Sequence, residues 1–208
     1  MEFRLTYKGS LPSQSVGASR IREKHAIRRQ IHAQLRELWH TNIVLERHTR
    51  QTQHTRKLIV PDLRSDESDV TTGLDFILRD HSKFGYRFVP LINEKIGIAC
   101  SLDILFLRRD GPGNLVAGGD IDNRIKVLFD GLRLPQNEGE IGKFSPQEGE
   151  NPFFCLLEDD KLITDVRITT DRLLTPKEGT ESPHEVQLVI HVVTKIVDPQ
   201  KAWPDFVF

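Results

Sequence analysis

Acidic and basic residues crowd into one short stretch, Gly118 to Leu132, which otherwise has the pattern of a buried helix. Its apolar residues recur at helical spacing and are Ile121, Ile125, Leu128, Phe129 and Leu132. After a Gly118-Gly119 loop, Asp120 is a natural N-cap, and Asp122 falls in the first turn, where a carboxylate is favoured. Lys126 follows Asp122 by four residues and shares its helix face. We expect Asp120 and Asp122 to converge at the mouth of this helix, with Lys126 one turn behind.

A second acidic pair, Asp159-Asp160, ends an apolar run and precedes a strand-like segment, Leu162 to Ile168. Taken alone, Asp-x-Asp is compatible with an ordinary capped helix, and Asp159-Asp160 with a turn before a strand. Mg²⁺ prefers a few carboxylates plus waters, which suits phosphodiester hydrolysis by a metal-activated water. No cysteine or histidine lies close to these acids in sequence, which favours a hard cation over zinc.

The two segments together resemble the RusA family of Holliday junction resolvases. That family's Asp-x-Asp-Asn-x-x-Lys motif matches Asp120 to Lys126, and its later Asp-Asp pair, which precedes a strand, matches Asp159-Asp160. The strong match covers roughly residues 118–168. The resemblance implies an Mg²⁺-dependent endonuclease that acts as a homodimer on branched DNA, in recombination and repair. A two-fold dimer also suits a junction whose two related strands must be cut together.

The resemblance also implies roles for individual residues. The implied catalytic residues are Asp120, Asp122, Lys126 and Asp160, of which the three aspartates would hold Mg²⁺, with Mn²⁺ as the expected substitute. Lys126 would stabilise developing negative charge or orient the attacking water. Asn123 and Asp159 would support the ligands by hydrogen bonding, although Asp159 could also bind the metal directly. For Lys126 an ordinary ion pair with Asp122 or Asp130 stays open, and Asp130 is expected to be its surface or supporting partner rather than a ligand.

The net charge of −1 does not indicate nucleic-acid binding, but its distribution does. Residues 1–57 hold 12 Lys+Arg and 4 Asp+Glu, a balance of +8, and the rest of the chain has a balance of −9. Such asymmetry suggests a basic surface for a polyanion beside an acidic part, although solvated helix faces are also often charged. The residues expected to contact DNA phosphates are Arg22, Lys24, Arg28, Arg29, Arg108 and Arg109.

The periodicity predicts a single α+β domain over residues 1–208, with a mixed or mainly antiparallel sheet backed by two main helices. Strands are expected at 3–7, 96–107, 162–168 and 186–193, the last apolar on both faces and therefore central. Helices are expected at 20–40, 73–81 and 120–132. Segments 41–85 and 135–155 read as insertions. Because the loop 135–152 is acidic and would repel DNA, we expect it to swing away or to order only in a complex.

Cys100 and Cys155 lie in apolar runs and read as buried thiols rather than a disulfide framework. No segment is long and apolar enough for a membrane span, and the start lacks the apolar core of a signal peptide, so a cytoplasmic protein is expected. Five scattered histidines do not match a zinc site and are expected to be exposed or to face DNA; they are His25, His32, His40, His48 and His54.

Two other functions compete with the nuclease. A non-catalytic DNA-binding or assembly protein could be built on the same fold. A metal-dependent hydrolase of free nucleotides ranks last, because the sequence has no Gly-x-x-x-x-Gly-Lys-Ser/Thr phosphate loop.

Overall fold

The computed structural model describes residues 1–12, 20–50, 72–109, 120–174 and 184–203. Within these ranges the chain forms one α+β domain, as the periodicity predicts. The sequence also predicts a short strand at Leu58–Pro61 and an acidic loop at Ser65–Asp69. Both segments and the Gly118-Gly119 loop lie outside the described residues.

A four-stranded mixed sheet carries most of the chain, in the order β1-β7-β4-β6. Its strands are β1 (Glu2–Ser10), β4 (Ile98–Arg108), β6 (Ile163–Arg172) and β7 (Glu185–Ile196). β7 runs antiparallel to β1 and β4, whereas β6 runs parallel to β4. All four strands were expected, and β7 is central between β1 and β4, as its apolar pattern predicts.

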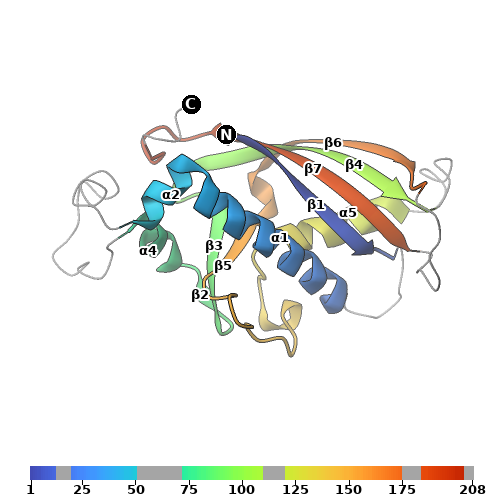
Figure 1. Cartoon of the computed structure of the whole chain (residues 1–208), viewed down its shortest axis with the longest axis horizontal. Helices are drawn as coiled ribbons and strands as arrows, with labels where there is room; N and C mark the ends of the chain where they lie inside the picture. The colour runs from blue at the N-terminus through green and yellow to red at the C-terminus, as the bar shows by residue number, and fades with distance from the viewer. Residues whose placement is uncertain (13–19, 51–71, 110–119, 175–183, 204–208) are drawn as a thin grey trace.

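Two long helices lie on the same side of this sheet (Figure 1). They are α1 (Ile21–Thr41) and α5 (Asp120–Leu132). Alternate residues of β4 face them and are buried, namely Ile98, Cys100, Leu102, Ile104 and Phe106. The helices approach closely at Gly131, where an added Cβ would lie 2.7 Å from Ile27 Cβ. This arrangement is the predicted sheet backed by two main helices.

A second, smaller sheet was not expected. It consists of β2 (Ser82–Lys83), β3 (Tyr86–Ile92) and β5 (Phe153–Leu157), with β3 parallel to β5. A satellite aromatic cluster forms around it, in which Tyr86, Phe88 and Phe153 are buried together. The segment 84–95 has little alternation because β3 is buried on both faces, so the period-2 signal that identifies a strand is absent.

Two short helices close one end of the domain. They are α2 (Ile43–Thr49) and α4 (Gly73–Leu78), the latter being the short helix expected at 73–81. Trp203 is buried and stacks on His48 with ring centroids 3.9 Å apart. The end of the chain therefore packs back onto its own domain as far as Trp203.

The prediction for the histidines was wrong at three positions. His25, His32 and His48 are buried, and only His40 of the described four is exposed. His25 stacks on Phe144 with centroids 4.1 Å apart, and His32 stacks on Phe153 at 4.5 Å. A neutral imidazole can take an aromatic position in a core, and spacing alone does not distinguish that use from exposure. Both cysteines are free and buried, as expected.

Candidate active site

The Asp120 segment forms the start of α5, as the sequence predicts. Asp120 is its first residue, and the Asp120 side chain lies outside the described part of the chain. Ile125, Val127 and Leu128 are buried against the core, while Asp122, Asn123 and Lys126 are exposed. The local amphipathic pattern therefore directs the acid, the amide and the lysine to the surface.

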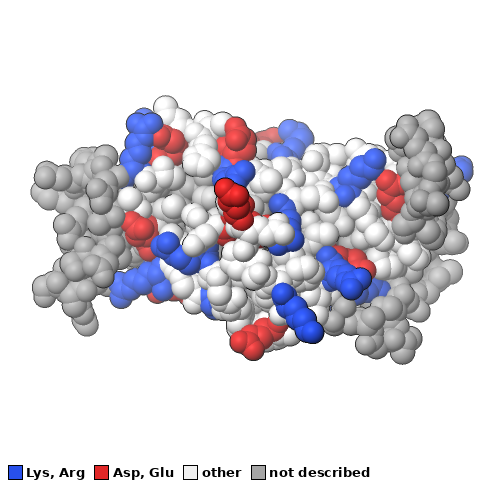
Figure 2. Space-filling view, turned by 60° about the horizontal axis from the view of Figure 1, so that its bottom comes forward, with Lys and Arg blue, Asp and Glu red and all other residues white. Residues whose placement is uncertain are grey.

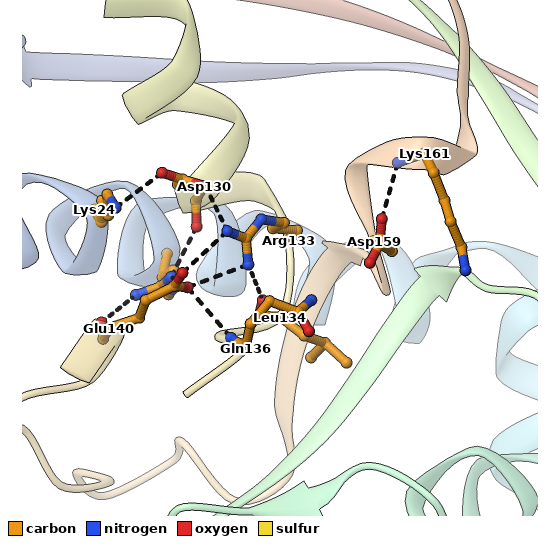
Figure 3. Close-up of polar contacts among 9 residues, drawn as sticks. Lys24, Asp130, Arg133, Leu134, Gln136, Glu140, Asp159 and Lys161 are labelled. Carbon is orange, nitrogen blue, oxygen red and sulfur yellow. Dashed lines mark hydrogen bonds and ion pairs between the residues drawn. The ribbon is translucent and has the colours of Figure 1, made fainter. Parts of the chain in front are cut away.

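The ordinary ion pairs considered for Lys126 do not form. Neither Asp122 nor Lys126 makes an ion pair with any other residue in the ranges that the structure describes. Asp130 is instead buried and bound by Lys24 Nζ at 2.8 Å and by Arg133 at 2.6 Å (Figure 3). The expectation that Asp130 partners Lys126 was therefore wrong, because α1 and the end of α5 supply closer cations.

The Asp159-Asp160 pair forms a tight turn between β5 and β6. Asp159 caps the single 3-10 turn Asp160–Leu162 (η3), and its Oδ1 accepts the Lys161 N–H at 3.0 Å. This hydrogen bond, a side-chain interaction with Asp160 and the Lys161 charge outweigh partial burial and hold the pKa of Asp159 below its usual value. Asp160 is exposed. Asp159 therefore caps the turn, and the Asp160 side chain is accessible.

Glu158 and His81 brace this turn, and the sequence analysis missed both. Glu158 Oε2 accepts the Glu94 N–H at 2.8 Å, and its Oε1 lies 3.4 Å from His81 Nε2. Hydrogen bonding to His81 lowers the pKa of Glu158. Lys161 Nζ reaches Glu94 Oε1 at 2.6 Å from the other side. Glu158 was visible in the sequence as the acid directly before Asp159, but its partner, 77 positions away at His81, was not.

The candidate ligands lie at opposite ends of α5 within one chain. Asp122 is in the first turn, whereas the last turn meets β5 through the Leu134 N–H bond to Leu157 O at 3.0 Å. The Asp159 turn follows directly after Leu157, and Figure 3 shows Asp159 beside Arg133. A helical rise of 1.5 Å per residue puts roughly 16 Å between the Cα atoms of Asp122 and Arg133. One chain therefore does not bring Asp122 and Asp160 together.

Three of the basic side chains expected to bind DNA are used inside the protein. Lys24 pairs with Asp130, and Arg29 pairs with Glu150 at 2.8 Å. Arg28 is 2% exposed, and its guanidinium donates to the carbonyl oxygens of Asp130 at 2.7 Å and Glu140 at 2.9 Å. These cations neutralise acids from the second half of the chain, so the charge asymmetry reflects internal pairing at these positions rather than an open basic surface.

Of the other three residues expected to contact DNA, two are buried or paired with an acid. Arg108 is buried, and Arg109 pairs with Glu185 at 2.8 Å. Arg22 on α1 is exposed. On the face shown in Figure 2, basic and acidic side chains alternate and form no continuous patch of one sign. Of the six residues, only Arg22 is exposed and forms no ion pair within the described ranges.

The acidic loop 135–152 does not swing away. Its Glu140 carboxylate binds Arg133 at 3.0 Å (Figure 3) and lies 3.5 Å from Arg28. Its Glu150 binds Arg29. Ile141 is buried in the aromatic cluster. The expectation of a mobile loop was wrong because its glutamates neutralise the cations of α1 rather than meeting DNA.

No three His, Cys, Asp or Glu side chains in the described ranges are grouped closely enough to hold a metal ion, and Asp120 lies outside that comparison. No described helix has the length and apolar character that crossing a membrane requires. Neither protein-family models, nor curated proteins, nor solved structures gave a match to this chain. The resemblance to RusA therefore rests on the residues and their spacing.

Proposed function

We propose that this chain is an Mg²⁺-dependent, structure-selective endodeoxyribonuclease that acts as a homodimer on Holliday junctions or related branched DNA. The observation that carries the proposal is the start of α5, where Asp122 and Lys126 are exposed and make no ion pair with any described residue. Acids and lysines four residues apart on a helix commonly pair. A carboxylate and an ammonium that stay accessible on a buried helix suit a phosphodiester ligand.

Each residue has a defined part in this proposal. Asp120, Asp122 and Asp160 would hold the metal ion, which when bound supplies charge relief on the phosphate and an activated water. Lys126 would neutralise the developing charge on the phosphate oxygens. Asp159 acts as a positioning residue, because its bond to the Lys161 N–H fixes the turn that carries Asp160. Asn123 would support the ligand carboxylates from the first turn of α5.

A second observation, besides the symmetry of the junction, supports the homodimer. Asp122 and Asp160 lie at opposite ends of α5 in one chain, and a carboxylate pair that binds one ion must meet within a few ångströms. A second copy, related by a two-fold axis, can supply Asp160 to the end where Asp122 lies. Each dimer would then contain two equal sites, one for each of two related strands.

A non-catalytic DNA-binding protein is the second candidate. It is favoured by the separation of Asp122 from Asp160 and by the absence of a three-ligand group among the described side chains. Such a protein would bind branched DNA without needing Asp122. The two candidates therefore differ in one measurable respect, the effect of removing that carboxylate on cleavage.

The test is cleavage of an end-labelled synthetic four-way junction in Mg²⁺ or Mn²⁺, beside linear duplex and flap controls. Asp122→Asn is compared with Asp103→Asn, an exposed aspartate on the other face of the sheet. We expect paired symmetrical nicks from the wild type and Asp103→Asn, and at least a hundredfold slower cutting by Asp122→Asn.

Cutting by Asp122→Asn at the wild-type rate would contradict the assigned site. Binding of the junction without any cutting by the wild type would favour the non-catalytic protein. Cutting confined to flaps would keep the chemistry and change the substrate.

A further inference from the structure

β6 is an open edge of the four-stranded sheet. It is 10 residues long and, among the described strands, pairs only with β4. Every side chain from Thr164 to Thr169 is exposed. Two of them are apolar, Val166 at 38% and Ile168 at 37% exposure, and both lie on the helix-covered side of the sheet, in register with Leu102 and Ile104. A long edge strand with exposed apolar side chains is a template for pairing with another strand.

Two hydrogen bonds show which backbone N–H and C=O groups of β6 point toward β4 and which point away from it. The Leu173 N–H donates to Arg108 O at 2.8 Å, so the odd-numbered residues point toward β4. The Arg172 N–H turns the other way and donates to the Asp171 side chain at 2.7 Å. β6 has a bulge at Thr164, opposite Cys100 and Ser101, so the alternation is followed from Asp165 onward. Because the direction alternates along a strand, the N–H and C=O groups of Val166, Ile168 and Thr170 point outward. No described side chain binds the N–H groups of these three residues.

We propose that β6 pairs antiparallel with β6 of a second copy of this chain, about a two-fold axis at Val166. The free N–H and C=O groups of Val166 in the two copies then bond to each other. Asp165 lies opposite Arg167 of the second copy, and by symmetry Arg167 lies opposite Asp165. These are non-hydrogen-bonded positions, where opposed side chains lie closest. Val166 and Ile168 of both copies gather on one face and lose their exposure to water.

Charge complementarity selects this register over its neighbours. A two-fold axis at Arg167 opposes two arginines, and an axis at Ile168 opposes Asp165 to Asp171. An axis at Thr169 pairs Arg167 with Asp171 but sets the apolar Val166 against Arg172. Like charges directly opposed destabilise a strand pair. The axis at Val166 alone gives two ion pairs and an apolar contact together.

This inference rests on the homodimer of the proposed function and names its interface. In this register the start of β6 in the second copy lies beside the end of β6 in the first, so the turn that carries Asp160 of the second copy comes to the end where β4 and β6 finish. α5 begins at that same end of the sheet (Figure 1). The pairing therefore carries Asp160 of one copy toward the end of the other copy that bears Asp122.

The experiment measures the mass of the full chain in solution, without DNA or metal, by light scattering across a concentration series. The wild type should have twice the 23.9 kDa chain mass. Asp165→Arg and Arg167→Asp should each raise the dimer dissociation constant by roughly a hundredfold, because both symmetric ion pairs become repulsive. Both positions are exposed, so thermal melting should confirm folded monomers.

The two single variants serve as matched partners for each other. When they are mixed, the opposed charges are complementary again, and a heterodimer should form. The double variant Asp165→Arg/Arg167→Asp should also dimerise. A monomeric wild type, single variants that dimerise normally, or a mixture that stays monomeric would each overturn the interface.

Cross-linking tests the register. Val166→Cys should give a disulfide-linked dimer on mild oxidation, because the two positions face each other, whereas Ile168→Cys should not. Cys100 and Cys155 are buried and provide little background. A link through Ile168→Cys alone would overturn the register. If the wild type dimerises but cuts no DNA, the interface would stand and the proposed nuclease would not. The failures of the two proposals can therefore be distinguished.

Discussion

The two edges of the four-stranded sheet are treated in opposite ways. At the β1 edge, Gln34 Oε1 accepts the Thr6 N–H at 2.8 Å, and its Nε2 donates to Thr6 O at 2.7 Å. Gln30 repeats this pairing with Lys8, at 3.1 and 2.9 Å. At the β6 edge, the corresponding groups of Val166, Ile168 and Thr170 have no such cap among the described residues. Among the described residues, side chains of α1 cap one edge, and no side chain caps the other.

Short sequence patterns account for the difference between the two edges. Gln30 and Gln34 are four residues apart, so both amides lie on the same face of α1 and meet alternate residues of β1. β6 instead alternates apolar or threonine side chains with Asp165, Arg167 and Asp171, a pattern that permits self-pairing in one register. Natural sheets usually protect their edges, which is the ground on which the pairing of β6 is proposed.

The largest expected effect is a loss of folding stability when α1, whose side chains cap the β1 edge, is destabilised. Burial first, and then Arg29 and Arg28, lower the pKa of His25 to about 4. The folded state holds His25 neutral, so its stability is intact above the ordinary pKa of 6.5 and falls as the pH drops from 6.5 toward 4. The loss at pH 4 should reach about 3 kcal/mol. Urea unfolding between pH 7 and pH 4 measures it.

His25→Phe is the matched variant for that titration. Phenylalanine keeps the stack on Phe144 and removes two buried ring nitrogens that have no hydrogen-bond partner. Its stability at pH 7 should equal or exceed that of the wild type, and the slope between pH 6.5 and pH 4 should flatten. An unchanged slope would show that His25 is not the titrating group.

A smaller effect should follow from opening the β1 edge directly. Gln34→Ala removes both hydrogen bonds to the Thr6 backbone and should cost about 1 kcal/mol in the free energy of unfolding. Gln34→Glu keeps an acceptor for the Thr6 N–H but loses the donor, so it should cost less. Denaturant unfolding at fixed protein concentration compares the two. Equal stability of Gln34→Ala and wild type would mean that water replaces the amide without loss.

The smallest effect on folding is expected at the open edge. Val166→Lys changes an exposed position and should alter the unfolding free energy of the monomer by less than about 0.5 kcal/mol. The same change should abolish the dimer, because the two lysines face each other across the two-fold axis. Light scattering measures whether Val166→Lys dimerises. Denaturant unfolding, with Val166→Lys added to a variant that is already monomeric, measures the change in the unfolding free energy. A dimeric Val166→Lys protein would show that the edge is not the interface.

Much of the fold follows from local pattern. Alternation identified the strands around Leu5, Ile104 and Ile190, and a 3.6-residue period identified α1 and α5. β3 escaped because a strand buried on both faces has no alternation. β5 was recognised only as an apolar run before Asp159-Asp160, since five buried residues fit a strand and a helix equally well.

The candidate site was predictable only in its local parts. The sequence correctly set Asp122 and Lys126 on the exposed face of a helix and Asp159-Asp160 in a turn before a strand. It did not predict that Arg28 and Arg29 would be neutralised by Glu140 and Glu150, more than 100 residues away. Such pairings depend on how α1 and the loop 135–152 meet, which no local period encodes.

The central claim is a nuclease whose site is completed by a second copy, and mixing two inactive variants tests it most directly. Asp122→Asn and Asp160→Asn should each leave the four-way junction uncut. In a mixed dimer, one site carries both substitutions and the other carries none, so the mixture should regain nicking, on one strand only. Each variant alone, at the total concentration of the mixture, is the control. A mixture that stays inactive, although mass measurement shows mixed dimers, would contradict a site shared between two copies.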